Sequence, residues 1–158
     1  AVVIFGGLIA VMWAAKHPYD IYREKPLPGI ALTGLDGREF TSREWVGKPI
    51  AINIMASWCG PCREELPELA ELGQHIPVYA IATQDSAERL KALFEKRGNP
   101  FRGVGIDSVG QMMFLLRVNG IPTTLFLDSS GRIAFVREGA MEKGEVEARL
   151  LPIIRQIH

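Results

Sequence analysis

The chain has 158 residues, of which 47% are apolar, and its 18 Lys and Arg balance its 18 Asp and Glu. Because the net charge is zero, no basic field attracts a nucleic acid, and we expect no nucleic-acid partner. The length is enough for one domain with a hydrophobic core, preceded by a short additional segment.

That additional segment is the apolar, uncharged run over residues 1–15. It is shorter than the roughly 20 residues of a spanning helix, but Trp13 near its end suits a membrane interface. A cleaved signal peptide is the alternative, although residues 8–16 contain no small-x-small cleavage site. We therefore predict a transmembrane anchor over residues 1–15, a polar tether over 16–25 and a single domain over 26–158.

Three elements are predicted early in this domain. Residues 41–44 (TSRE) have the capping-box pattern that begins a short helix. The apolar run over residues 50–56 predicts a buried strand. Residues 63–72 predict a helix, because leucines recur there at three-residue spacing. This order of strand, turn and helix places Cys59 at the helix N-terminus.

The turn contains both cysteines of the chain, in the run Trp58-Cys59-Gly60-Pro61-Cys62. Two thiols at this spacing can form a small disulfide ring and open it again. A helix N-terminus favours an anion and lowers a thiol pKa. A zinc site would need four ligands, and the three histidines show no ligand spacing. A structural disulfide normally closes a longer loop. We predict a redox-active disulfide, with no metal and no other cofactor.

Further elements follow along the chain. Residues 78–83 predict a second buried strand, and Asp85 and Ser86 can cap a helix that ends before Gly98. The glycines of residues 103–105 superficially suggest a nucleotide-binding loop. The third glycine of that fingerprint is missing, so we exclude this function.

The last third of the domain predicts a short helix, a hairpin and a final helix. Asp107 and Ser108 can cap the short helix, whose methionines are expected to fill the core rather than bind copper. Residues 123–127 and 133–137 predict two strands joined by a turn. The final helix is expected over 145–157, with a kink or break at its proline.

The Trp-Cys-Gly-Pro-Cys run resembles the thioredoxin superfamily. Pro67, eight residues after Cys59, matches the helix-kinking proline of that superfamily, and residues 120–123 (GIPT) resemble its cis-proline loop. A cis bond before Pro122 costs only about 0.5–1 kcal/mol because an X-Pro amide tolerates it. The resemblance implies an α/β thioredoxin-like fold: a central mixed sheet flanked by helices, with an N-terminal β-hairpin and a mid-domain helical insertion.

A closer resemblance is to the membrane-anchored, extracytoplasmic branch typified by TlpA, ResA and CcmG (DsbE). Residues 28–40 resemble its opening hairpin, and Asn53 replaces the buried Asp of thioredoxins. Glu65 falls where this branch carries a functional acidic residue. Alternatively, it is one of three glutamates on a solvated helix face. Thr123 and the Gly-Pro between the cysteines depart from CcmG and favour a general TlpA-like reductase.

The resemblance also implies a mechanism. Cys59 attacks a substrate disulfide as a thiolate, and the more buried Cys62 then releases the reduced substrate. Glu65 is expected to shuttle the proton that Cys62 loses, beside a hydrogen bond from Asn53. Ile121 is expected to pair with the substrate backbone through its main chain. The expected substrate contacts are Trp58, Gly60, Pro61, Ile121 and Pro122, although Trp58 alternatively only packs at the rim.

The same resemblance predicts partners and location. We expect a disulfide reductase at the inner membrane, single-pass, with its redox domain on the periplasmic side. Its electrons would come from a membrane thiol transporter of the DsbD or CcdA type. Its substrate would be an exported disulfide-bearing protein, with apocytochrome c as one candidate.

The sequence leaves one other function open and disfavours a second. A tethered binding module or chaperone without redox turnover remains an alternative. A peroxidase of the peroxiredoxin type would need Thr or Ser three residues before the reactive cysteine, where this chain has Ala56.

Overall fold

The computed structural model describes residue 23 and residues 25–158. The predicted anchor and nearly all of the predicted tether lie outside these residues, so the division into anchor, tether and domain stays a prediction. Within the described part, no helix combines the length and the apolar character needed to cross a membrane.

Seven strands form one mixed sheet in the order β2-β1-β5-β4-β3-β6-β7. Strands β3, β4 and β5 are parallel to one another, whereas the strands at both edges pair antiparallel. The strands are β1 (Ala31–Gly34), β2 (Glu39–Thr41), β3 (Ile50–Met55), β4 (Val78–Thr83), β5 (Val104–Asp107), β6 (Thr123–Leu127) and β7 (Ile133–Glu138). The expected opening hairpin is confirmed as β1 and β2, and the expected closing hairpin as β6 and β7.

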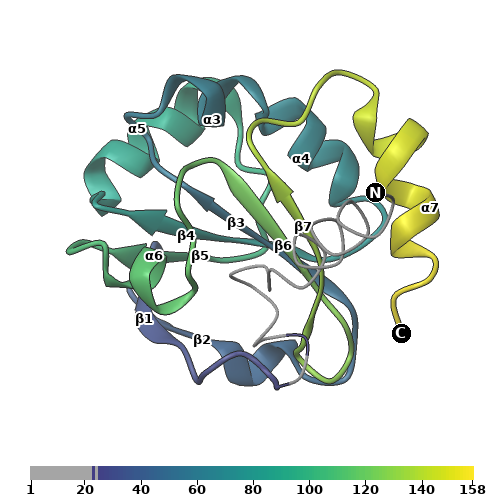
Figure 1. Cartoon of the computed structure of the whole chain (residues 1–158). Coiled ribbons are helices and arrows are strands. Elements are labelled where there is room, and N and C mark those ends of the chain that lie inside the picture. Colours follow the sequence, from purple (N-terminus) through teal and green to yellow (C-terminus); the bar gives the residue numbers. More distant parts are fainter. Residues whose placement is uncertain (1–22, 24) are drawn as a thin grey trace, which may run out of the picture.

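Helices cover both faces of the sheet (Figure 1). Every residue of β3 and β4 is buried, as expected for central strands covered on both sides. One face packs against α3 (Gly60–Glu64), α4 (Leu66–Leu72), α5 (Ala87–Arg97), the π-helical turn η2 (Val146–Leu150) and α7 (Leu151–Ile154). The other face packs against the 3-10 helix η1 (Ser42–Trp45) and α6 (Gln111–Leu115).

The strand β5 was missed by the sequence patterns, which suggested only a glycine-rich stretch there. The glycines have a packing reason. A Cβ on Gly105 would lie 2.4 Å from the ring of Phe40. The backbone of β5 can therefore pack this close to the ring only because residue 105 has no side chain. The helix α5 is thus followed by β5, a strand that the sequence patterns did not predict.

The helix predicted over residues 63–72 is two helices. The first begins at Gly60, earlier than predicted, and the break falls at Glu65. Pro67 lies in the first turn of α4, where its missing N–H costs nothing, in agreement with the expected kink. The final helix is likewise divided, because Pro152 lies in the first turn of α7, which begins at Leu151 directly after the π-helical turn.

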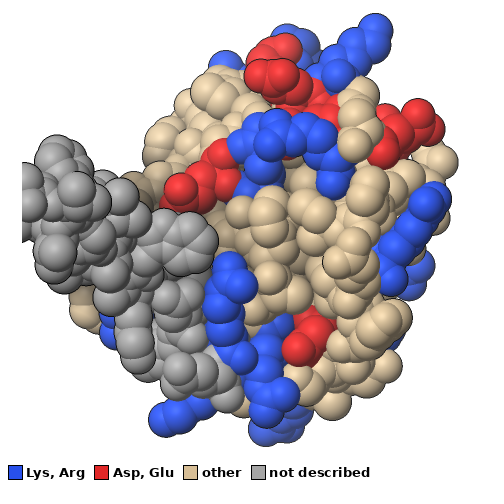
Figure 2. Space-filling model, turned by 45° about the vertical axis from the view of Figure 1, so that its right-hand side comes forward, with Lys and Arg blue, Asp and Glu red and all other residues tan. Residues whose placement is uncertain are grey.

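Two expected helix caps differ in detail. The α6 helix is capped by Asp107 alone, whose carboxylate accepts from the backbone amides of Gly110, Gln111 and Met112. The η1 helix begins at Ser42 with Thr41 as its N-cap, in agreement with the capping-box pattern, but the Thr41 hydroxyl accepts from the amide of Arg43 and not from that of Glu44. Figure 2 shows acidic and basic side chains lying side by side on the face that it draws, consistent with the zero net charge.

Candidate active site

The two cysteines form a disulfide at the point where β3 ends and α3 begins. Their Cα atoms are 5.3 Å apart. Cys59 is the N-cap of α3, and its Sγ accepts a hydrogen bond of 3.3 Å from the amide of Cys62. Cys59 is 7% exposed whereas Cys62 is fully buried. Of the two cysteines, therefore, only Cys59 keeps a small solvent-exposed fraction.

The turn before the disulfide is held in place by Gln84 and Asp85, which directly follow β4. The Asp85 carboxylate accepts from the Ser57 amide at 2.5 Å and from the Ser57 hydroxyl at 2.8 Å, and it pairs with Arg89 at 3.0 Å. Next to it, the indole N–H of Trp58 donates to the carbonyl of Gln84 at 3.1 Å. These contacts fix the approach to Cys59. The sequence analysis treated Asp85 only as a helix cap and missed this role.

Trp58 lies at the rim of the site, with 53% of its surface exposed. Among the other predicted substrate contacts, Pro61 is exposed and Gly60 is half-buried, with open space where a side chain would be. The surface over the disulfide is thus accessible.

The expected cis-proline loop is confirmed, because the Ile121–Pro122 peptide bond is cis. Pro122 is buried and Ile121 is partly exposed. The loop is closed by the Thr123 hydroxyl, which donates to the carbonyl of Gly120 at 2.8 Å. Ile121 lies two residues before Thr123, where β6 and its strand pairings begin.

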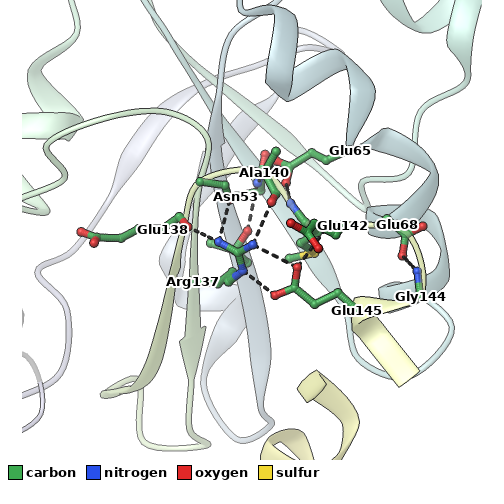
Figure 3. Close-up of polar contacts among 12 residues, drawn as sticks. Asn53, Glu65, Glu68, Arg137, Glu138, Ala140, Glu142, Gly144 and Glu145 are labelled. Atoms are coloured by element: carbon green, nitrogen blue, oxygen red, sulfur yellow. Dashed lines mark hydrogen bonds and ion pairs between the residues drawn. The ribbon is translucent and has the colours of Figure 1, made fainter. Parts of the chain in front are cut away.

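Glu65 is buried, with 1% of its surface exposed. One carboxylate oxygen accepts from the Asn53 side-chain amide at 2.9 Å, and the other accepts from the Met141 backbone amide at 2.9 Å (Figure 3). The alternative of a solvated glutamate face is wrong for this residue. Of the other two glutamates, Glu64 is exposed, whereas Glu68 is buried and accepts from the amide of Gly144 at 3.2 Å.

Burial raises the pKa of Glu65 above its usual value of 4.5. The hydrogen bonds from Met141 and Asn53 and the charge of Arg137 oppose this rise without cancelling it. Because its pKa is raised, Glu65 holds and exchanges its proton at higher pH than an exposed glutamate does.

Asn53 connects this carboxyl group to the neighbouring strand. Its amide also donates to the hydroxyl of Thr124 at 3.0 Å, from the residue opposite it on β6. Its side-chain oxygen is buried without a hydrogen-bond partner among the described residues. The sequence analysis missed Thr124 and Met141, because strand register and loop packing place them at the site.

No group of three His, Cys, Asp or Glu that could hold a metal ion occurs within residues 23 and 25–158. Of the residues predicted for the site, the structure brings Asn53, Glu65 and the cysteine-bearing α3 into one region, and the cis-proline loop precedes the strand that pairs with β3. Pro67 lies outside this region, in the first turn of α4 and exposed.

A disulfide in the turn after the central strand of such a sheet, with one cysteine slightly exposed and the other fully buried, defines a class of protein. It is a thioredoxin-like thiol–disulfide oxidoreductase, whose reaction partners are thiols and disulfides. More particularly, the chain belongs to the AhpC/TSA family, whose sequence profile matches residues 24–136.

Individual relatives agree with this class. The chain is 33% identical over 134 residues to a thiol:disulfide interchange protein DsbE homolog from Paracoccus denitrificans, covering 84% of this chain and 74% of that protein. It is 28% identical to the thiol-disulfide oxidoreductase ResA from Geobacillus thermodenitrificans, covering 78% and 73%. The structure also resembles that of a thiol:disulfide interchange protein from Chlorobium tepidum, with a TM-score of 0.68, 24% identity and coverage of 84% and 94%. This last likeness confirms the predicted fold.

Proposed function

We propose that the protein reduces disulfides of exported proteins, with Cys59 as nucleophile and Cys62 as resolving thiol. The observation that supports this assignment is the difference in burial between the two residues, since Cys59 is 7% exposed and Cys62 is fully buried. In the reduced protein, the amide of Cys62 that contacts the Cys59 sulfur would stabilise a thiolate there.

The reaction is two successive exchanges. The Cys59 thiolate attacks one sulfur of the substrate disulfide, and the other substrate sulfur leaves as a thiolate. Cys62 then loses its proton and attacks the Cys59 sulfur, which expels the second substrate sulfur and restores the Cys59–Cys62 disulfide. Two electrons pass to the substrate, and the protein must be reduced again before another cycle.

Glu65 is the proposed acceptor of the Cys62 proton. It is three residues after Cys62 in the chain, buried, and has a raised pKa. Asn53 can serve both protonation states of Glu65, because an amide carries donors and an acceptor. It now donates to the carboxylate, and its unpartnered oxygen would accept from a protonated carboxyl after rotation of the amide.

The substrate is proposed to lie across the disulfide and the cis-proline loop. Ile121 lies just outside the strand pairings of β6, so its main chain can pair with an extended substrate segment. Trp58, Gly60, Pro61 and Pro122 would form the remaining contact surface.

Location and partners complete the proposal. An anchor over residues 1–15 would hold the domain on the periplasmic side of the inner membrane, and a membrane thiol transporter would supply electrons. Apocytochrome c is the first substrate to test. The proposal of a disulfide-bearing substrate is supported by the relatives named as a thiol:disulfide interchange protein DsbE homolog and as a thiol-disulfide oxidoreductase ResA.

A trapping experiment tests the proposal. In a Cys62→Ser variant of the full chain, Cys59 should remain disulfide-linked to its substrate, because the resolving thiol is missing. Capture of a protein with a CxxCH motif would support the cytochrome role, and capture of another exported protein would change only the substrate. If partners bind without any disulfide link, the redox proposal fails and a binding module or chaperone takes its place.

A further inference from the structure

The loop between β7 and η2 lies against the helix pair that carries the disulfide. Two of its backbone amides bind carboxylates of that pair, since Met141 donates to Glu65 and Gly144 donates to Glu68. The sequence separation is 76 residues in both contacts. The position of this loop therefore decides whether Glu65 has its second hydrogen bond.

Arg137, on β7, binds both the backbone and a side chain of this loop region (Figure 3). Its guanidinium pairs with both carboxylate oxygens of Glu145, at 2.5 Å and 3.0 Å. It also donates to three successive carbonyls, those of Glu138, Gly139 and Ala140, the last at 2.8 Å. The arginine fork thus shapes the chain just ahead of Met141.

One peptide unit links the arginine to the glutamate. The carbonyl of Ala140 and the amide of Met141 belong to the same planar peptide group, whose C=O and N–H point in opposite directions. Arg137 binds the oxygen of this group, and Glu65 accepts from its N–H at 2.9 Å. Hydrogen bonds in such a series polarise one another, so the guanidinium strengthens the donor that Glu65 receives.

We propose that Arg137 is a positioning residue for Glu65, which orients the Ala140–Met141 peptide so that its N–H stabilises the Glu65 carboxylate. This inference rests on the proton-transfer role proposed for Glu65. The same contact would make the proton acceptor available at lower pH than burial alone allows.

Other charged groups around Glu65 limit how this effect can arise. Glu145, at the start of η2, faces both Arg137 and Glu65, and Glu142 lies on the loop close to Arg137. Glu145 neutralises much of the guanidinium charge through its two contacts. The peptide hydrogen bond, rather than direct attraction between Arg137 and Glu65, is therefore the main route.

The test compares Arg137→Gln with a matched control, Glu68→Gln. The control loosens the same loop at Gly144 but removes no contact of Glu65. Carboxyl NMR titration of the oxidised protein should show the Glu65 midpoint rising by about one pH unit in Arg137→Gln, the effect of one charge-assisted hydrogen bond. The midpoint should not move in Glu68→Gln. Equal midpoints in the two variants would overturn the proposal.

A second readout separates this inference from the role of Glu65 itself. The pH profile of thiol–disulfide exchange should shift in Arg137→Gln, and the shift should vanish in a Glu65→Gln background. If the NMR midpoint moves while the exchange profile does not, Arg137 positions Glu65 but Glu65 is not the proton acceptor. Arg137→Lys, which keeps a charge without the fork, covers the case in which the Gln variant does not fold. It should raise the midpoint as well.

Discussion

The two faces of the central sheet support opposite kinds of interior. On one face, Phe40 packs edge to face against Trp45 and Tyr79, which are tilted against each other, and the three ring centroids are 5.5–6.3 Å apart. On the other, Asn53 and Glu65 form a buried polar network directly under the disulfide-bearing helix. The aromatic face contributes mainly to stability and the polar face mainly to chemistry. Substitutions on the two faces should therefore affect different measurements.

The largest effect is expected at Cys59. Cys59→Ser removes the proposed nucleophile, so reduction of a model disulfide should fall to background. The fold should persist, because Ser is close in size to Cys and the other residues of both core clusters keep their packing. An insulin-reduction assay, with circular dichroism as the control for folding, checks both statements. Residual turnover in this variant would contradict the assignment of the nucleophile.

The next effect concerns the aromatic face. Trp45 is 3% exposed, and its indole N–H has no partner among the described residues, so Trp45→Ala removes packing without breaking a hydrogen bond. We expect a loss of about 3–5 kcal/mol in the free energy of unfolding. The pH profile of exchange by the remaining folded protein should be unchanged. Phe114→Ala, at a residue 90% exposed, is the control and should change stability by less than about 0.5 kcal/mol.

A smaller loss of stability is expected on the same face, where the backbone of β5 packs closely against the ring of Phe40. Gly105→Ala places a methyl group 2.4 Å from the Phe40 ring and should cost about 1–3 kcal/mol in urea unfolding. Gly103→Ala is a matched comparison, because its nearest contacts are 3.4 Å and 3.5 Å. If the two variants were equally stable, the ring would have room to move, and the packing reason for Gly105 would be wrong.

The smallest effect is expected on the polar face, in the pH dependence of stability that is linked to Glu65. The folded state holds a proton on Glu65 above pH 4.5, where the unfolded chain has lost it. The stability linked to this group is therefore fully present below 4.5 and falls as pH rises through the raised pKa. Glu65→Gln should lack this decline. Urea unfolding of both oxidised proteins, from below pH 4.5 to neutral, measures the difference, and parallel curves would contradict burial as the dominant influence.

Local patterns in the sequence predict a large part of this molecule. The apolar runs at β3, β4 and β6 and the turn between β6 and β7 lie in short stretches of chain, and each was predicted within a residue of its observed bounds. The Cys59–Cys62 pair and the cis bond at Pro122 also follow from neighbouring residues. Glycine and proline limit the backbone locally, and burial periodicity appears along a single element.

Only the tertiary structure shows what surrounds Glu65. The sequence places the glutamate on a helix but does not distinguish it from Glu64, which is exposed. Its partners Asn53 and Met141 are 12 and 76 residues away, brought together by strand pairing and by a loop shaped around Arg137. Such contacts depend on register and on the path of the chain between elements. The sequence by itself thus determined the redox pair and its scaffold, whereas tertiary packing decided the environment that sets the proton chemistry.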